Sequence, residues 1–177
     1  MFTIRLAQAS EKAQLAALIA RSGTGLSAGF YTDAQAAAVT REVFGVDSAL
    51  VADGTYFAVE DEGGALVACG GWSRRATDFG GDQHKTGNDR LLDPAIEPAR
   101  IRAFFVEPAM ARRGLGTMLL EHCQRAAAEA GFTALELVST MPGEPLYLAH
   151  GFRAVQSIAL PLSDGVVIAL TRMRKDL

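Results

Sequence analysis

Hydrophobic residues recur along this chain with two different periods. In some segments apolar and polar positions alternate, or apolar residues run together between turn residues, as they do in β-strands. The apolar segments on either side of DEGG, residues 61–64, additionally have the pattern of a β-hairpin. The predicted strands cover residues 2–7, 55–60, 65–73, 100–106, 133–139, 151–160 and 166–173.

Other segments place apolar residues on one face of a helix, as Leu15, Leu18 and Ile19 do in the first of them. We expect Ser10 and Thr32 to cap the first two helices, because both residue types are favoured at N-caps. The predicted helices cover residues 11–22, 32–45, 114–131 and 143–150.

The order of these segments, β-α-α-β-β-β-α-β-α-β-β, predicts an α/β fold with a mixed central sheet flanked by helices. No repeat, linker or block of charge divides the chain, so residues 1–177 are expected to form a single domain. A long polar stretch, residues 74–99, interrupts the strands. Loops of this length in compact domains are usually functional or disordered, and we expect this one to contribute to specificity.

Composition excludes several classes of protein. The net charge of −3 argues against a general nucleic-acid binder. No apolar run approaches the ~20 residues that span a bilayer, and the start MFTIRLAQAS lacks the features of a secretory signal, so we expect a cytoplasmic protein without a membrane segment. Cys69 and Cys123 lie far apart in sequence and are expected to be buried, reduced thiols. The sequence indicates no metal site, and it leaves open whether the chain forms a homodimer.

The segment FFVEPAMARRGLGTML, residues 104–119, contains the clearest candidate for chemistry. A strand passes through a turn with Arg112 and Arg113 into a helix that begins across Gly114 and Gly116. The first N–H groups of a helix have no internal partner, glycines let a ligand approach the backbone, and arginines add contacts to phosphate oxygens. The turn therefore predicts an anion-binding site. It does not fit a dinucleotide fingerprint, because Leu119 stands where a third glycine is needed, and it lacks the Lys-Ser/Thr of a P-loop.

This segment resembles the glycine turn of the GNAT superfamily of acyl-CoA-dependent N-acetyltransferases, whose pattern is Arg/Gln-x-x-Gly-x-Gly/Ala after an apolar strand and a nearby proline. The downstream segment PLYLAHGF, residues 145–152, resembles the family's aromatic-Tyr-x-x-x-Gly-Phe segment, with Leu146 in the aromatic position. The spacing of the two motifs and the order of the preceding elements extend the resemblance over nearly the whole chain.

The resemblance implies an acetyl-CoA-dependent transfer of an acetyl group to an amine. A backbone N–H near Val106 would stabilise the oxyanion, and Tyr147 would protonate the departing CoA thiolate as the general acid. Backbone groups of the strand would pair with the pantetheine arm as an added strand does, and the turn would hold the pyrophosphate. The implied acetyl-CoA contacts are Phe104, Phe105, Val106, Arg112, Arg113, Gly114, Leu115, Gly116 and Thr117.

Three positions depart from the family pattern. Ala111 and Pro142 replace polar residues that contact the cofactor in many members, so those side-chain contacts are lost. Arg100 stands where some members carry a glutamate base. The sequence leaves three other carboxylates as candidates for this base, without a choice among them: Glu107, Glu136 and Glu144.

The acceptor is expected to be the amine of a small molecule or, less favoured, of a protein side chain. Strand alternation places Arg100, Arg102 and Phe104 on one face, and the two arginines would attract an anionic group on the acceptor, unless they form ion pairs with aspartates of the preceding loop. Trp72, in the segment GGWSRR, is a further candidate for contact with the acceptor. The alternative from a different class is a non-catalytic module that binds or senses acyl-CoA.

Overall fold

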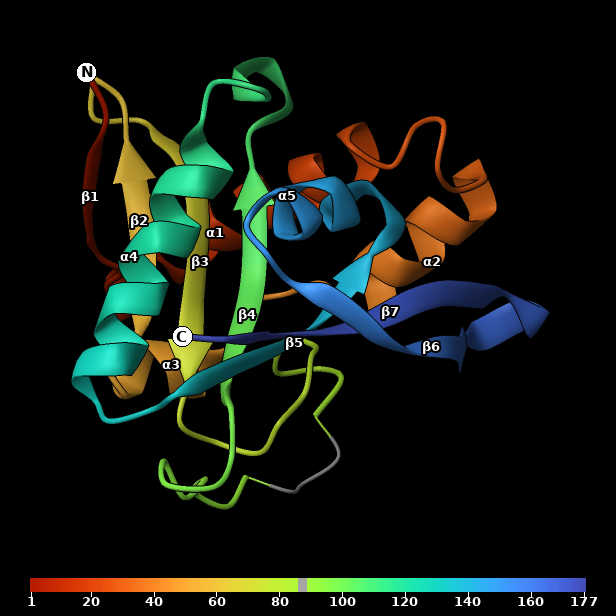
Figure 1. The fold of residues 1–177 in the computed structure, drawn as a ribbon. Coiled ribbons are helices and arrows are strands. Elements are labelled where there is room, and N and C mark those ends of the chain that lie inside the picture. Colours follow the sequence, from red (N-terminus) through yellow and green to blue (C-terminus); the bar gives the residue numbers. More distant parts are fainter. Residues whose placement is uncertain (86–88) are drawn as a thin grey trace.

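The computed structural model describes residues 1–85 and 89–177 as one α/β domain. Figure 1 shows the sheet with its helices, and their order along the chain confirms the fold class expected from the sequence. The elements are β1 (Thr3–Leu6), α1 (Lys12–Gly25), α2 (Asp33–Glu42), α3 (Ser48–Ala52), β2 (Tyr56–Glu60), β3 (Leu66–Ser73), β4 (Ala99–Val106), α4 (Leu115–Glu129), β5 (Ala134–Thr140), α5 (Glu144–Ala149), β6 (Arg153–Pro161) and β7 (Val167–Asp176).

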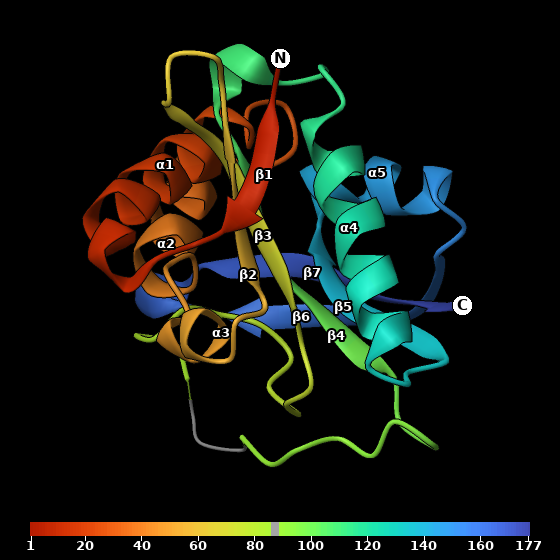
Figure 2. The same ribbon diagram turned by 90° about the vertical axis from the view of Figure 1, so that its left-hand side faces the viewer.

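The seven strands form one mixed sheet in the order β1-β2-β3-β4-β5-β7-β6. Only the central pair, β4 and β5, is parallel, and α4 makes the crossover that a parallel pair requires. Helices α1, α2 and α3 cover one face of the sheet, and α4 and α5 cover the other (Figure 2). The sheet therefore separates two layers of helices, and a ligand that passes between β4 and β5 would reach both.

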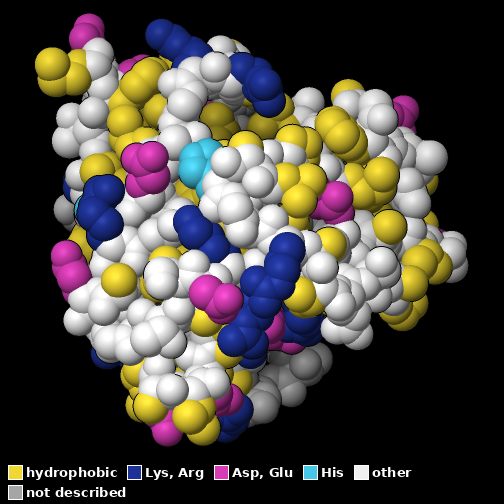
Figure 3. Space-filling model, viewed as in Figure 1, with side chains coloured by type: hydrophobic (Ala, Val, Ile, Leu, Met, Phe, Trp, Pro, Cys, Tyr) yellow, Lys and Arg dark blue, Asp and Glu magenta, His cyan; other side chains and the backbone are white. Residues whose placement is uncertain are grey.

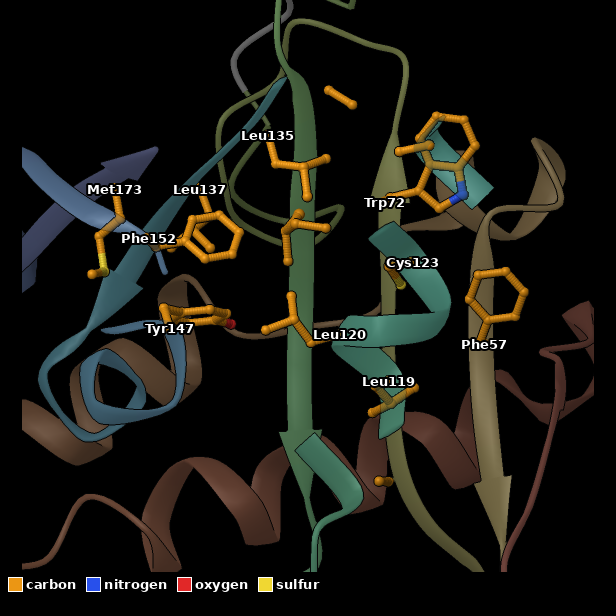
Figure 4. Packing of buried hydrophobic residues seen from close by; sticks show 14 of the residues in the cluster. Phe57, Trp72, Leu119, Leu120, Cys123, Leu135, Leu137, Tyr147, Phe152 and Met173 are labelled. Carbon is orange, nitrogen blue, oxygen red and sulfur yellow. The ribbon is translucent and has the colours of Figure 1, made fainter. Parts of the chain in front are cut away.

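Three buried clusters hold these layers together. The largest packs α4 against the sheet through residues such as Leu119, Leu120, Cys123 and Leu135, which are fully buried (Figure 4). A second cluster joins α1 and α3 to the sheet, and a third joins α2 to β7. Both cysteines are free and buried, as expected, and burial raises the pKa of the Cys69 thiol to about 12.

A local sequence signal sets the start of α2. Thr32 caps α2, where its hydroxyl oxygen accepts a hydrogen bond from the Gln35 N–H, as predicted. The expected cap at Ser10 is wrong, because Ser10 lies inside a short 3₁₀ turn, Ala9–Glu11. The start of this turn is capped by Glu11, whose carboxylate accepts from the Gln8 N–H at 2.8 Å.

The sequence pattern missed α3, a helix of five residues that is too short to show a helical period. The expected second helix ends at Glu42 instead of Gly45, and the chain then turns into α3 at Asp47. The Asp47 carboxylate accepts from the Ala49 N–H at 3.0 Å and so caps the new helix.

The long polar stretch is anchored at its start and end. Arg75 and Leu91 form an isolated antiparallel bridge, and the Leu92 N–H donates to the Arg74 carbonyl at 2.8 Å. These contacts join the two ends of the stretch to each other. Arg75 also donates to the carboxylate of Asp53, at the end of α3, at 2.6 Å, so the beginning of the stretch lies against the body of the domain.

Among the described residues, no helix is both long enough and apolar enough to cross a membrane.

Candidate active site

The sheet opens where β4 and β5, the parallel pair among the described strands, separate. β4 and β5 are paired only at Ala99 with Leu135 and at Arg100 with Glu136, and the strands diverge beyond these residues. A cleft of about 810 Å³ lies in the opening and is lined by residues of both helical layers. An unpaired strand edge inside a cleft can take up an extended ligand by backbone hydrogen bonds. The lining includes Phe104, Phe105 and Val106, the strand residues expected to contact the pantetheine arm.

A β-bulge in β4 changes which side chains face which layer. Ala103 has a left-handed φ of 55°, and the pairing with β3 shifts in register between Cys69 and Gly71. Phe104 consequently packs into the α4 cluster, whereas Phe105 meets Phe44, in the segment after α2, with ring centroids 5.2 Å apart. The expectation that Arg100, Arg102 and Phe104 share one face is wrong at Phe104, because strict alternation ends at the bulge.

The glycine turn leaves backbone donors free at the mouth of the cleft. Gly114 precedes α4 with a φ of 83°, and the first bond within the helix runs from the Met118 N–H to the Gly114 carbonyl at 2.9 Å. The N–H groups of Leu115, Gly116 and Thr117 therefore have no acceptor in the helix. A Cβ at Gly114 would meet no atom within 4 Å, so open space lies above this residue. These features fit a phosphate group.

The two arginines of the turn differ in direction. Arg112, at a left-handed φ of 64°, lines the cleft together with Gly114 and Thr117. Arg113 does not line it: its guanidinium lies 5.3 Å from the centre of the Phe2 ring, and its Nη1 is 2.9 Å from the Met110 sulfur. A side-chain contact from Arg113 to the cosubstrate is thus not supported. Lys and Arg side chains stand out over this end of the molecule in Figure 3.

Tyr147 lies in the cleft, where α5 faces β4. Its ring packs near Phe104 and Phe152, at centroid distances of 6.3 and 5.7 Å, and its hydroxyl is directed toward β4 (Figure 4). The residue is 8% exposed, and burial, with a smaller contribution from Cys123, raises the pKa of the phenol. The phenol is therefore protonated at neutral pH. Within the described part of the chain the hydroxyl has no hydrogen-bond partner.

Ser22 of α1 reaches the edge of β4 from the opposite layer. Its hydroxyl oxygen accepts a hydrogen bond from the Val106 N–H at 3.1 Å. Ser22 is buried and also lines the cleft. The N–H group expected to act near the reacting carbonyl is therefore engaged by a serine, a contact that the sequence pattern did not indicate.

Arg102 lines the cleft but is already engaged by its neighbours. Its Nη2 donates to the Asp47 carboxylate and to the Gly80 carbonyl, each at 2.8 Å, and its Nη1 donates to the Thr77 carbonyl at 3.0 Å. Lys85 also pairs with Asp47. Arg102 thus ties the start of the loop after β3 to α3, and the expectation that it attracts an anionic acceptor is not supported.

Arg100 takes part in a second network at the point where β4 and β5 separate. It pairs with Asp78 at 3.2 Å and with Glu136 at 3.3 Å, and Arg172 of β7 bonds to the same two carboxylates at 2.8 and 2.7 Å. Desolvation would raise the pKa of Asp78, but Arg172 and Arg100 outweigh it and lower the pKa. Arg100 does not line the cleft, so contact with the acceptor is unsupported here too.

Trp72 lies in the core, away from the cleft. It is 3% exposed and packs in the α4 cluster against Phe132, at a centroid distance of 6.0 Å. It does not line the cleft, because this position of β3 faces the layer of α4. The structure therefore gives no support for the expected contact between Trp72 and the acceptor.

The three carboxylates considered as general bases lie outside the cleft lining. Glu107 pairs with Arg21 at 2.8 Å, Glu136 belongs to the network of Arg100, and Glu144 accepts a hydrogen bond from the Thr171 hydroxyl. Asp78 is the carboxylate that does line the cleft among the described residues. No three His, Cys, Asp or Glu side chains of the described residues are arranged to hold a metal ion.

Several lining residues were not singled out from the sequence. Phe44 and Gly45 follow α2, Phe79 lies in the loop after β3, and His150 caps α5, where its Nδ1 lies 2.8 Å from the Leu146 carbonyl. Of these residues, Phe79 lies in the long polar stretch, which was expected to contribute to specificity. Residues 78–81 of this stretch line the cleft, and Arg102 holds them there through the Gly80 carbonyl.

The diverging strand pair and the free N–H groups of the turn form a site of the kind that accepts an extended, phosphorylated ligand. Comparisons with known proteins agree with a site of this kind. A family model described as "Acetyltransferase (GNAT) domain" matches residues 52–154, more than half of the chain. The chain belongs to the GNAT family of acetyltransferases.

Solved structures share the fold over nearly their whole length. A "GCN5-related N-acetyltransferase: aminotransferase, class-II" from Rhodopseudomonas palustris is 20% identical at a TM-score of 0.72, covering 99% of this chain and 95% of that one. The PaiA N-acetyltransferase of Thermoplasma acidophilum, in complex with coenzyme A, is 13% identical at a TM-score of 0.67, covering 100% and 99%. A GCN5-related N-acetyltransferase from Kribbella flavida is 17% identical at 0.60, covering 99% and 98%. No curated protein sequence matches the chain significantly.

Proposed function

We propose that this enzyme transfers the acetyl group of acetyl-CoA to the amine of a small molecule by direct attack, with Tyr147 as the general acid. The observation that carries the proposal is the position of Tyr147, whose protonated hydroxyl lies in the same cleft as the free donors of the glycine turn. A relative with the same fold is in complex with coenzyme A, which supports the choice of cosubstrate.

Binding is assigned to the backbone of the turn and of β4. The N–H groups of residues 115–117 would hold the pyrophosphate, and Arg112 would add a charge-assisted contact. The open edge of β4 would pair with the pantetheine arm. A carbonyl oxygen that binds the Val106 N–H would replace the Ser22 hydroxyl oxygen, which occupies this donor in the structure.

The reaction joins the amine nitrogen to the acetyl carbon and breaks the bond between that carbon and sulfur. Tyr147 would give its proton to the sulfur, which leaves as the thiol of CoA, and the proton lost by the amine would return to the phenolate through water. The raised pKa of Tyr147 suits this role, because it keeps the proton on the phenol until the sulfur needs it. Small acceptors are favoured over proteins because the cleft is enclosed by α1, the segment after α2 and the loop after β3.

Substitution of Tyr147 by Phe tests the proposal. Phe keeps the ring and its packing but lacks the proton, so we expect turnover in single-turnover experiments with saturating acceptor to fall by ~10²-fold, within the range for general acid catalysis. Affinity for CoA, measured by calorimetry, should stay nearly unchanged. Turnover and catalytic efficiency should fall together, since the contact exists mainly in the transition state.

Tyr31→Phe is a matched control. The Tyr31 hydroxyl donates to the Ala169 carbonyl at 2.8 Å and accepts from the Met141 N–H, and the residue does not line the cleft. This variant loses a hydroxyl of the same kind and should keep the rate of the chemical step. Full chemical-step activity in Tyr147→Phe would show that Tyr147 is not the acid.

A further inference from the structure

The wall of the cleft on the α2 side is apolar. Val39 of α2, Val43 directly after α2 and Leu170 of β7 are buried side chains that line it. Phe44 and Phe79 complete this wall. These residues also belong to the third buried cluster, so the wall is held by the core of the domain. It lies in the layer opposite to α4 and α5, the layer that contains Tyr147 (Figure 2).

The two charged side chains on this side of the cleft are both paired within the protein. Asp78 is held by Arg172 at 2.8 Å and by Arg100 at 3.2 Å. Arg102 is held by Asp47 at 2.8 Å, with 2% of its side chain exposed. The other titratable groups of the described lining, Arg112, Tyr147 and His150, come from the turn and from α5. The wall therefore presents apolar surface, and each of its two charges is paired with an opposite charge of the protein. The Arg102 Nε has no hydrogen-bond partner among the described residues, but it is buried and offers no accessible donor to a ligand.

We propose that the acceptor is an amine carried on an apolar body, such as an arylalkylamine, that binds the α2 wall and reacts in its neutral form. This inference rests on the proposed function and specifies its acceptor. An ammonium or carboxylate group transferred to such a wall loses its hydration and finds both charged side chains of this wall already paired, whereas an aromatic or alkyl body gains by burial.

The same wall makes a carboxylate base unnecessary; Asp78, the carboxylate of the described lining, is paired with two arginines. Apolar surroundings disfavour the charged form of an amine and lower its pKa, so the acceptor enters as the nucleophilic free base. The proton that the nitrogen loses on acylation matches the one that Tyr147 gives to the sulfur, so the overall reaction needs no net proton acceptor. Asp78 serves as a part of the wall and is held ionised by its two arginines.

Three acceptor amines test whether the enzyme prefers an apolar body on the acceptor, with release of free thiol as the measurement. Phenethylamine, phenylalanine and putrescine share a primary amine, but the second adds a carboxylate and the third replaces the ring by another ammonium. We expect the catalytic efficiency for phenethylamine to exceed that for each of the others by at least about tenfold, the scale on which apolar pockets discriminate. A preference for phenylalanine or putrescine would overturn the inference and leave acetyl transfer intact. No thiol release with any amine, despite CoA binding, would overturn the proposed function.

The pH profile tests the neutral reacting form. Below the pKa of the amine, the catalytic efficiency for phenethylamine should rise about tenfold per pH unit, because only the free base reacts. With 2,2-difluoro-2-phenylethylamine, which has the same ring and chain but a less basic amine, the rise should end at a correspondingly lower pH. A rise that ends at the same pH for both acceptors would report a base of the enzyme, such as His150, and would contradict the inference.

Phe79→Ala tests the wall itself. We expect it to lower the catalytic efficiency for phenethylamine by roughly tenfold or more, with little change for methylamine, which has no body to bind. Val155→Ala is the control, because Val155 is 47% exposed on β6 and lies outside the cleft. If Phe79→Ala folds, binds CoA and affects both acceptors equally, Phe79 does not contact the acceptor body and the assignment of the wall is wrong.

Discussion

Arg102 and Asp47 form an ion pair that is almost completely removed from water, with the residues 3% and 1% exposed. Burial lowers the pKa of Arg102, and the Asp47 carboxylate opposes that effect. A buried pair contributes little net stability compared with an apolar pair, but loss of one partner leaves an uncompensated charge. The pair also connects α3 with the loop after β3, because Arg102 donates to the Thr77 and Gly80 carbonyls.

We therefore predict that Arg102→Met lowers the free energy of unfolding by up to about 3–5 kcal/mol, the range for an uncompensated buried charge, because Lys85 alone would remain to compensate Asp47. Urea denaturation at neutral pH measures the change. Arg21→Met is the control, because Arg21 has a side chain that is 52% exposed and pairs with Glu107 at the surface. That variant should lose at most about 1 kcal/mol. Equal stability of Arg102→Met and the unsubstituted protein would show that the pair is not structurally important.

At the scale of single elements, β4 shows what strand periodicity can and cannot predict. Its position and extent followed from its apolar residues, but the direction of each side chain did not, because the bulge at Ala103 adds a residue on one strand. Gly70 on β3 permits the bulge: a Cβ there would lie 2.4 Å from the Phe104 ring. A glycine inside a strand is a recognised signal of a bulge, so GGWS contained a hint of it.

Helix α4 offers a test of the glycine turn with an internal control. Gly114 and Gly131 bound the helix at its two ends with φ values of 83° and 91°. A Cβ at Gly114 would project into the open space assigned to phosphate, whereas one at Gly131 would make an ordinary contact of 3.8 Å with Pro94. Alanine at either position should destabilise the fold by about 1–2 kcal/mol, because both backbones are left-handed.

Only Gly114→Ala should in addition weaken binding of CoA, which calorimetry can measure on both folded variants. We expect a loss of about tenfold or more, because the methyl group keeps the pyrophosphate from the N–H groups of residues 115–117. If both variants bound CoA as well as the unsubstituted protein, the phosphate site would lie elsewhere.

At the scale of the whole molecule, the glycine turn and the Tyr147 segment could be found from sequence because each is a local pattern, and the structure brings both to one cleft. The apolar wall on the α2 side of the cleft could not be found in this way. It combines α2, β7 and residues 78–81, whose contact depends on the divergence of β4 from β5 and on the ion pairs of Arg102 and Arg172. The contacts of Trp72 and Arg102 could not be predicted for the same reason, since their surroundings come from distant parts of the chain.

This arrangement predicts how the molecule responds to its cosubstrate. The cleft lies between the layers of α1–α2 and α4–α5, so a ligand that binds there contacts both and stabilises only the folded state. At about 100 times its dissociation constant, acetyl-CoA should add roughly 2.7 kcal/mol to the free energy of unfolding and raise Tm accordingly.

NAD and ATP at the same concentration are the controls for that measurement. Both carry phosphates that the turn could attract, but neither has a pantetheine arm to pair with β4, so each should raise Tm less than acetyl-CoA does. CoA without the acetyl group should stabilise the protein nearly as much as acetyl-CoA, because the assigned contacts are to the pyrophosphate and the arm. Equal shifts with all four ligands would mean that the turn binds anions in general, and the strand edge of β4 would then have no part in recognition.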